Sequence, residues 1–111
     1  MARYIPECGH LIWLDFSPQA GHEQSGKRPA LVISPAIYNK IGLALVCPIT
    51  QQIKGYPFEV LIPEGLNTKG VVLSDHVKNM DYKVRKAKFI EKLPVETIAE
   101  VLGHIGALIG V

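Results

Sequence analysis

Short apolar runs, separated by glycine, proline and polar residues, set the pattern along most of this chain. Runs of this length that are rich in β-branched residues favour strands over helices. We predict strands at residues 11–16, 28–34, 43–49, 58–62, 71–73 and 87–91, a helical turn at 35–38 and a polar bend at 78–86. In the first strand Ile12, Leu14 and Phe16 share one face. Leu11 and Trp13 lie on the other face, so we expect this strand to be covered on both sides.

The end of the chain has a different period. Pro94 opens an expected helix in which apolar residues recur every three and four positions and form one stripe: Ile98, Val101, Leu102, Ile105, Leu108 and Ile109. Gly103 and Gly106 each cost this helix about 1 kcal/mol relative to alanine, so packing must hold it. Many short strands followed by one helix predict a single domain over residues 1–111. Its expected fold is mainly β with a C-terminal α-helix, as a small, strongly bent antiparallel barrel.

Proline restricts the third predicted strand. Pro48 has no backbone N–H and cannot donate a ladder hydrogen bond, so we expect strand 43–49 to be an edge strand or to be bulged at this residue. Thr50 follows where the strand leaves its sheet, and residues 51–57 continue as a polar loop.

The composition of the 111 residues is that of an ordinary globular domain, with 48% hydrophobic and 20% charged residues, and it excludes a disordered tail. Cys8 and Cys47 lie far apart without a Cys-x-x-Cys motif, which predicts two buried free thiols in a reducing compartment. No run approaches the roughly 18 apolar residues of a membrane span, and the N-terminus lacks a signal-peptide core. We therefore expect a soluble, cytoplasmic protein.

The net charge of +2 says little about partners, but its distribution is uneven. Basic residues gather between positions 78 and 92: Lys78, Lys83, Arg85, Lys86, Lys88 and Lys92, opposed by Asp81 and Glu91. Such a patch attracts polyanions, and a solvated basic face is the alternative explanation.

Residues 21–27 form a polar stretch with a glycine near each end, which predicts a mobile surface loop. Arg28 and Pro29 then lead into the apolar strand, so Arg28 stands at the mouth of a rigid element with Glu23 five residues back in the loop. A cation fixed by a strand beside a closing loop suits a phosphate-directed site. A surface ion pair between the two residues is the alternative.

Four segments in order give the chain a family resemblance. They are Trp13-Leu14-Asp15-Phe16-Ser17-Pro18, Gly21 through Pro35, Cys47-Pro48-Ile49-Thr50 and Tyr56-Pro57-Phe58-Glu59-Val60. In this order and at this length the chain resembles the MazF/PemK family, the toxin halves of bacterial toxin–antitoxin pairs. The resemblance covers nearly the whole chain and is least diagnostic in the C-terminal helix.

The resemblance implies an SH3-like barrel of the CcdB/PemK type that forms a homodimer, and a sequence-selective endoribonuclease that cleaves single-stranded mRNA. It places Arg28 and Thr50 at the cleavage centre and suggests a 2′,3′-cyclic phosphate product. It also implies a cognate antitoxin whose flexible, acidic tail wraps the toxin dimer. A disordered acidic segment suits this task because it covers a wide surface as it folds.

The chemistry of each residue limits its role. Arg28 can stabilise the developing charge because its planar fork matches phosphate oxygens, but a guanidinium is a poor base. Thr50 can donate its hydroxyl to a phosphate oxygen. Its ordinary alternative is a strand-end hydroxyl that satisfies nearby backbone. Glu23 is the candidate for taking or relaying the proton of the attacking 2′-hydroxyl.

Single-stranded RNA is recognised by stacking on flat side chains and by hydrogen bonds to base edges. The candidates for RNA contact are Phe16, Lys27, Asn39, Gln51, Lys54, Tyr56, Asp75, His76 and Lys78. Core packing is the alternative for Phe16, and Asn39 and Gln51 are equally ordinary in turns. His22 and His76 are secondary candidates for acid–base work. A glutamine is usual in the family at the position of His76, which leaves the role of this histidine open.

Scattered histidines, distant cysteines and unclustered carboxylates give no closed ligand set, so we expect neither a metal site nor a cofactor. The alternative function is a non-catalytic toxin on the same scaffold that inhibits a protein target such as a topoisomerase. A cation at a strand mouth favours RNA cleavage, since a pure binding module has no need of it.

Overall fold

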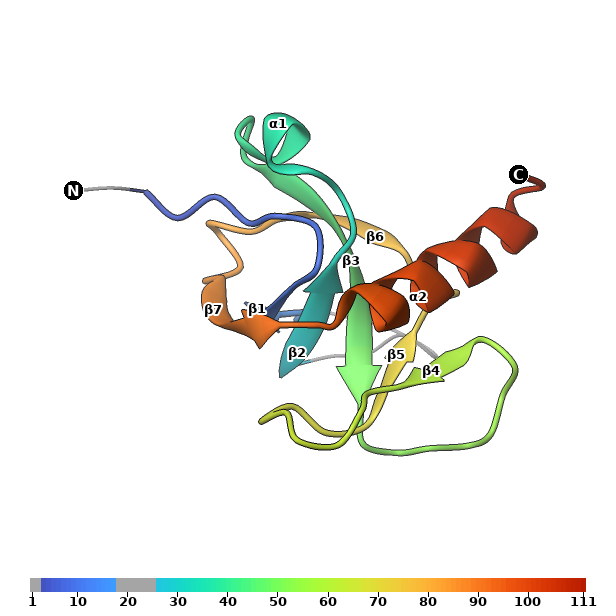
Figure 1. Ribbon diagram of the computed structural model, residues 1–111. Helices are drawn as coiled ribbons and strands as arrows, with labels where there is room; N and C mark the ends of the chain where they lie inside the picture. Colours follow the sequence, from blue (N-terminus) through green and yellow to red (C-terminus); the bar gives the residue numbers. More distant parts are fainter. Residues whose placement is uncertain (1–2, 18–25) are drawn as a thin grey trace.

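The computed structural model describes residues 3–17 and 26–111 (Figure 1). Its strands are β1 (His10–Asp15), β2 (Lys27–Val32), β3 (Leu43–Thr50), β4 (Glu59–Leu61), β5 (Val71–Leu73), β6 (Lys78–Asp81) and β7 (Lys88–Lys92). Its helices are α1 (Ala36–Asn39) and α2 (Val95–Leu108). The expected fold class, mainly β with a C-terminal helix, is confirmed.

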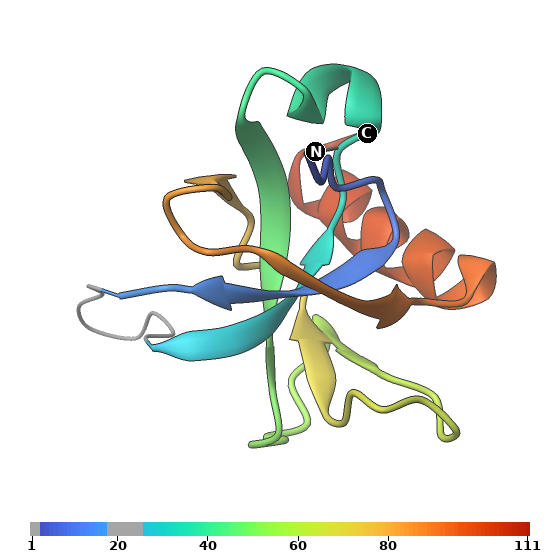
Figure 2. The same cartoon turned by 90° about the vertical axis from the view of Figure 1, so that its left-hand side faces the viewer.

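All strand pairs are antiparallel, in the order β4-β5-β3-β2-β1-β7, with β6 also paired to β3. Within the described residues no ladder joins the two ends of this order, so closure of the expected barrel is not detected. The described strands form a strongly bent sheet (Figure 2). Figure 2 shows β3 running between α1 at one end and β4 and β5 at the other, with β1, β2 and β7 crossing it.

β3 is a central strand, contrary to the expectation of an edge strand at Pro48. It pairs with β2 on one side, where Ala30 lies opposite Pro48. On its other side it pairs first with β6, up to Val46, and then with β5 from Ile49. Pro48 lies in the gap between these two partners, so its missing N–H falls where β3 changes neighbour and no ladder bond is needed.

Two apolar clusters cover the two faces of the sheet. The first contains Leu11, Leu31, Cys47, Ile49, Val60 and Val72 and receives Val101 of α2, with Ile98 and Ile105 packed against it. The second contains Ile12, Leu14, Ala30, Val32, Val46 and Tyr82. Both cysteines are free; Cys47 is buried, which raises its pKa to about 12, and Cys8 is half-buried. In the described part of the chain no helix has the length and apolar character needed to cross a membrane.

The expected helix is confirmed, with Pro94 directly before its first residue. Its apolar stripe is wider than the face that the sheet covers. Val101 is buried, whereas Leu102, Leu108 and Ile109 remain exposed. These three exposed side chains give α2 and the residue after it an apolar surface that the sheet does not cover.

The predicted polar bend at 78–86 is wrong in its first half. Residues Lys78–Asp81 form β6, which pairs with Leu43 through Val46 of β3. Met80 is its buried side chain and joins the second cluster. One inward residue in four gives too weak an alternation to identify a strand from sequence.

Phe16 is not available for RNA stacking, which corrects one expectation. Its side chain is fully buried in the second cluster beside Leu14. Its backbone N–H donates to Gly26 O at 2.8 Å, which joins the end of β1 to the start of β2. Core packing, the alternative role, is therefore the one that the fold uses.

Asn39 is likewise a structural residue and not an RNA contact. It is fully buried at the end of α1. Its Oδ1 accepts from Ser34 Oγ at 2.5 Å, and its Nδ2 donates to Pro6 O and Ser34 O, each at 2.8 Å. These bonds tie the N-terminal segment to the turn between β2 and β3, so no polar atom of the side chain is left for a base edge.

Asn39→Ala should therefore lower the free energy of unfolding by about 2–4 kcal/mol, since it orphans several buried polar groups. The RNA binding that the family resemblance implies should stay unchanged per folded molecule. Asn79→Ala is the control, because this exposed amide makes one bond to Tyr38 and its loss should cost less than about 0.5 kcal/mol. Urea unfolding measures both. A stable Asn39→Ala protein with weakened RNA binding would contradict the structural role.

Candidate functional site

Arg28 and Thr50 lie on neighbouring strands at the point where their ladder stops. The last pair in the direction of the site joins Ala30 to Pro48. Arg28 is two residues before Ala30 and Thr50 is two residues after Pro48, so continuing the register would set them opposite each other. Residues two apart on a strand share a face, and both side chains therefore project on the same side of the sheet.

The hydroxyl of Thr50 is held by local backbone. The side chain is 8% exposed, and its Oγ1 accepts a hydrogen bond from the backbone N–H of Gln52 at 3.1 Å. This is the backbone role given above as the alternative to catalysis. The bond uses the oxygen as an acceptor only and leaves the hydroxyl proton free to be donated.

The backbone of Gly70 packs directly against the backbone carbonyl of Thr50. The residue has a φ of +114°, and a Cβ built on it would stand 2.1 Å from Thr50 O. Only glycine combines this backbone conformation with so close an approach. The turn before β5 thereby sets the position of the last residue of β3.

A pocket of about 210 Å³, here called the loop pocket, opens on one side of Thr50. Its lining is Thr50, Gln52, Lys54, Tyr56, Glu59, Leu73, Asp75 and His76. The structure thus gathers five of the predicted site residues. Tyr56 is 61% exposed, and Lys54 Nζ lies 6.0 Å from its ring centroid. His76 Nε2 lies 3.8 Å from Asp75 Oδ1.

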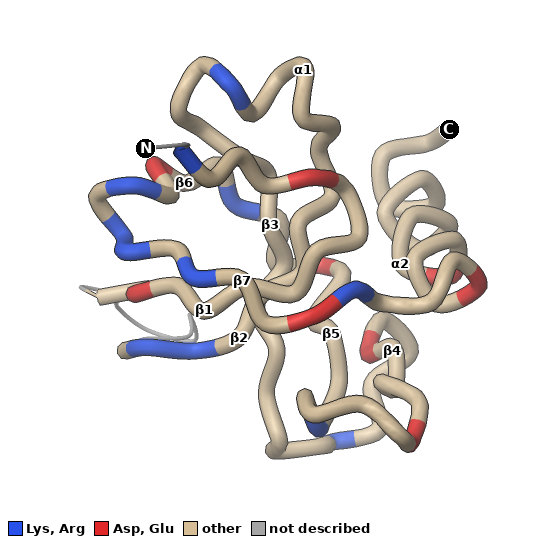
Figure 3. Tube along the Cα trace, turned by 60° about the vertical axis from the view of Figure 1, so that its left-hand side comes forward, with Lys and Arg blue, Asp and Glu red and all other residues tan. Residues whose placement is uncertain are grey.

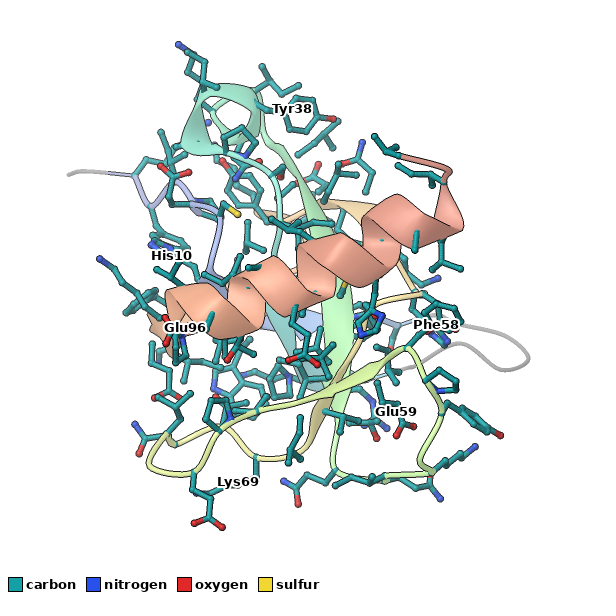
Figure 4. The ribbon with its side chains drawn as sticks, turned by 45° about the vertical axis from the view of Figure 1, so that its right-hand side comes forward. His10, Tyr38, Phe58, Glu59, Lys69 and Glu96 are labelled. Atoms are coloured by element: carbon teal, nitrogen blue, oxygen red, sulfur yellow. The ribbon has the colours of Figure 1, made fainter. Side chains whose placement is uncertain are left out.

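Glu59 holds the loop that forms one side of the loop pocket. Its carboxylate accepts from the backbone N–H groups of Lys54 at 3.2 Å and of Gly55 at 2.9 Å. Loop 51–58 is therefore closed over a β4 residue, and Lys54 keeps its side chain at the pocket. Figure 4 shows Glu59 on one side of the end of β3 and Lys69 on the other.

A second hollow of about 500 Å³, here called the long groove, lies on that other side. It is lined by Trp13, Lys27, Arg28, Pro29, Ile49, Gln51, Asn67, Thr68, Lys69 and Ile90. Lys27 Nζ lies 6.0 Å from the Trp13 ring centroid, and Trp13 is 37% exposed. The groove combines a flat ring, cations and amide side chains, which are the groups that bind single-stranded nucleic acid.

Glu91 builds the far wall of the long groove. Its carboxylate accepts from the backbone N–H groups of Asn67 at 3.1 Å and Thr68 at 2.7 Å, and from Thr68 Oγ1 at 2.7 Å. Partial burial opposes ionisation, but these hydrogen bonds hold the pKa of Glu91 below its ordinary value. The carboxylate of β7 thus fixes the loop that carries Lys69.

The remaining predicted site residues fall outside these two hollows or outside the described residues. Lys78 begins β6 opposite Val46 and lines neither the loop pocket nor the long groove. Glu23 and His22 lie outside the described residues. Arg28 and Lys78 each have an interaction partner.

Sequence reasoning missed the residues that shape the walls. Trp13, which we expected on a covered face of the first strand, lines the long groove together with Asn67 and Lys69. Glu91 binds backbone amides far along the chain, and Glu59 binds backbone amides of the loop just before it; a single sequence carries no signal for such bonds. Among the described residues no group of three or more His, Cys, Asp or Glu is placed to hold a metal ion.

Residues 7–109 match the model of a family described as "PemK-like, MazF-like toxin of type II toxin-antitoxin system". The chain is 44% identical over 111 residues to the endoribonuclease toxin MazF of Escherichia coli strain K12, covering 99% of each. It is 38% identical over 109 residues to the endoribonuclease toxin ChpB of the same strain, covering 93% of each. MazF from Deinococcus radiodurans superposes with a TM-score of 0.95 at 52% identity, over 98% of this chain and 100% of that one.

Gly70→Ala should lower the free energy of unfolding by more than about 2 kcal/mol, because strain at positive φ adds to a collision with the Thr50 carbonyl. Gly42→Ala is the matched control, since Gly42 has a φ of +109° with nothing within 4 Å of the added Cβ. The Gly42→Ala variant therefore has the backbone strain of positive φ without a collision. Urea unfolding of both variants isolates the collision, and equal losses would show that Gly70 does not set the position of Thr50.

Proposed function

We propose a mechanism for this chain from one premise: it belongs to the PemK-like, MazF-like toxin family of type II toxin–antitoxin systems and is an endoribonuclease. In this proposal it cleaves single-stranded RNA at the end of β3, between the loop pocket and the long groove. The observation that carries the proposal is the placement of Arg28 and Thr50. A cation and a hydroxyl project on the same face where two strands leave their ladder, with a hollow on each side.

The nucleophile comes from the substrate. The 2′-oxygen beside the scissile phosphate attacks phosphorus, the bond to the 5′-oxygen breaks, and a 2′,3′-cyclic phosphate and a 5′-hydroxyl result. The reaction needs stabilisation of the negative charge that grows on the phosphate oxygens. Arg28 supplies it with its planar fork. Thr50 donates its hydroxyl proton to a phosphate oxygen, while its own oxygen stays fixed by Gln52 N.

Two proton transfers complete the reaction. Glu23, our candidate acceptor, takes or relays the proton of the 2′-hydroxyl. The leaving 5′-oxygen needs a donor, and His76 is the group lining the loop pocket that exchanges protons near neutral pH. Its position supports this role, since Nε2 lies 3.8 Å from Asp75 Oδ1 and the ring is held beside a carboxylate.

The two hollows suit the nucleotides on either side of the cleaved bond. In the loop pocket, exposed Tyr56 offers a stacking surface and Lys54 a cation. In the long groove, Trp13 offers a ring, Lys27 a cation and Gln51 an amide for a base edge. Stacking tolerates any base, so the sequence selectivity that we propose must come from the few amide and carboxylate groups in the walls.

We further propose that the toxin is a cytoplasmic homodimer silenced by an antitoxin with an acidic, flexible tail. The exposed Leu102, Leu108 and Ile109 on α2 support an apolar interface with a second copy. The MazF of D. radiodurans, which is 52% identical to this chain, has a crystal structure as a MazE–MazF complex. This supports an antitoxin partner for this chain. Carboxylates of such a tail would satisfy the cations that otherwise meet RNA.

Arg28→Ala should lower the cleavage rate about 10²–10³-fold while the protein stays folded, because a charged transition-state contact is lost. Thr50→Val tests the hydroxyl at nearly constant volume and should reduce the rate more than the affinity for RNA. Lys40→Gln, an exposed lysine in the turn after α1, is the control for loss of one charge. Single-turnover cleavage of an RNA transcript measures all three. A folded Arg28→Ala protein that cleaves at the rate of the Lys40→Gln control would remove Arg28 from the site.

Cleavage should persist in excess chelator, since the 2′-hydroxyl, Arg28 and Thr50 together supply nucleophile and charge stabilisation without a metal. The product ends should be a 2′,3′-cyclic phosphate and a 5′-hydroxyl, which mass spectrometry identifies. If chelator stopped cleavage and magnesium restored it, metal independence and the mechanism above would both fall. If intact RNA survived under all conditions, the protein-binding toxin would be the better explanation.

A further inference from the structure

A third hollow lies apart from the cleavage centre and is surrounded by cations. It has a volume of about 230 Å³ and is lined by Arg3, Tyr4, Tyr82, Lys83, Lys86 and Ala87; it is called the Arg3 pocket below. Within residues 3–17 and 26–111, Arg3, Lys83 and Lys86 have no carboxylate within ion-pair distance. Three like charges around one hollow repel one another, and a bound anion would relieve this repulsion.

The turn that carries two of these lysines is rigid. Asp81 O accepts from Arg85 N at 3.0 Å, Lys83 O accepts from Lys86 N at 3.0 Å, and Tyr82 O accepts from Ala87 N at 2.8 Å. Lys86 has a φ of +59°, the one positive φ at a non-glycine residue in the described part of the chain. This conformation costs a lysine free energy that asparagine or glycine would largely avoid. Strain of this kind is characteristic of functional sites.

Hydrogen bonds also connect this turn to the end of β1, which pairs with the start of β2. Arg85 donates from a guanidinium nitrogen to Ser17 O at 2.6 Å, and Asp15 N donates to Arg85 O at 2.9 Å. The pKa of the Asp15 carboxyl is lowered first by the hydrogen bond from Ser17 N to its Oδ1, at 2.9 Å, and further by the charges of Arg85 and Lys86, so Asp15 offsets part of the positive charge of the turn. The Asp81 carboxylate similarly accepts from Val84 N at 3.1 Å. Each of these acids accepts a hydrogen bond from backbone, and within the described residues neither forms an ion pair with Arg3, Lys83 or Lys86.

A line of cations connects the Arg3 pocket with the long groove. Ala87 of the pocket is followed by Lys88, which lies opposite Trp13 of the groove. Trp13 in turn lies opposite Pro29, the neighbour of Arg28. Two strand spacings, about 10 Å, separate β7 from β2. Figure 3 shows the Lys and Arg residues of the N-terminal end, the β6–β7 turn and the start of β2 on one side of the molecule.

We propose that the Arg3 pocket binds a backbone phosphate of the same RNA, outside the nucleotides at the cleaved bond. This inference rests on the function proposed above. Single-stranded RNA fits because it carries a phosphate at every nucleotide, so a strand that leaves Arg28 along Lys88 presents phosphates to the pocket without any sequence requirement. Lysine and arginine on a rigid turn neutralise such phosphates as point charges. The pocket adds affinity for long RNA and no base specificity.

The test compares Lys83→Gln/Lys86→Asn with Lys40→Gln/Lys92→Gln. Both double variants lose two exposed lysines, and asparagine at position 86 accepts the left-handed backbone, so the turn is kept. Binding is measured by fluorescence anisotropy with 2′-O-methyl RNA of mixed sequence, which has no 2′-hydroxyl to react. One set of oligonucleotides barely exceeds the nucleotides at the cleaved bond, and the other is several times longer. Thermal unfolding checks that all variants remain folded.

For long RNA the Lys83/Lys86 variant should bind about tenfold more weakly than the wild type, and its salt dependence should fall by about 0.7 per lost phosphate contact. For short RNA the two double variants should bind alike. Equal binding of long RNA by both double variants would overturn the proposal. So would an equal loss for short and long RNA, which would indicate only a change in the overall field of the protein.

The same proteins distinguish this inference from the proposed function. If the wild type cleaves no RNA but the length-dependent loss of binding appears, the mechanism fails and the phosphate pocket stands. If cleavage is observed and the loss is absent, the reverse holds. Weakened binding of an acidic peptide together with unchanged binding of long RNA would assign the Arg3 pocket to a protein partner and overturn the RNA assignment.

Discussion

One strand, β3, joins the two parts of the bent sheet. It pairs with β2 along one edge and with β6 and then β5 along the other, so both parts of the bent sheet depend on it. The change of partner falls at Pro48, which lacks the N–H that a continuous ladder would require. The bend therefore costs no hydrogen bond at this residue. Because β3 passes from one half of the sheet into the other, its last residue, Thr50, emerges with a hollow on each side.

Carboxylates organise the walls around this strand, and cations are left to face the solvent. Glu59 fixes the loop that carries Lys54, and Glu91 fixes the loop that carries Lys69. Glu7 does the same for the N-terminal segment, where hydrogen bonds from Ala36 N and Cys8 N lower its pKa. Each of these carboxylates holds backbone amides in place, and Glu91 is also close enough to Lys69 for that charge to contribute to its lowered pKa. A chain with a net charge of only +2 can in this way keep positive hollows for a polyanion.

The sequence predicted those features that depend on local pattern. Apolar runs located six strands, and the period of the last segment located α2 with Pro94 before it. β6 was missed because only Met80 points inward, and its pairing is decided by β3. Phe16 and Asn39 were candidates for RNA contact from their residue types, but long-range packing and bonds to Pro6 and Ser34 bury them. The bonds of Glu91 to Asn67 and Thr68 join residues more than twenty positions apart, which one sequence does not reveal. The bonds of Glu59 to Lys54 and Gly55 are local, but no sequence motif marks them.

The position of the proposed cleavage centre follows from how a ladder ends. Inside a ladder, backbone groups are satisfied by the partner strand and leave no room for a ligand. In a loop, side chains have room but lack fixed positions, which electrostatic stabilisation requires. Arg28 and Thr50 lie between these cases. Each is two residues beyond the last pair of the β2–β3 ladder and is still paired on its other side, Arg28 with Leu14 and Thr50 with Val71. A phosphate between them would occupy the place of the next cross-strand bonds. Strand separation thus supplies both the space and the rigidity that phosphate chemistry needs.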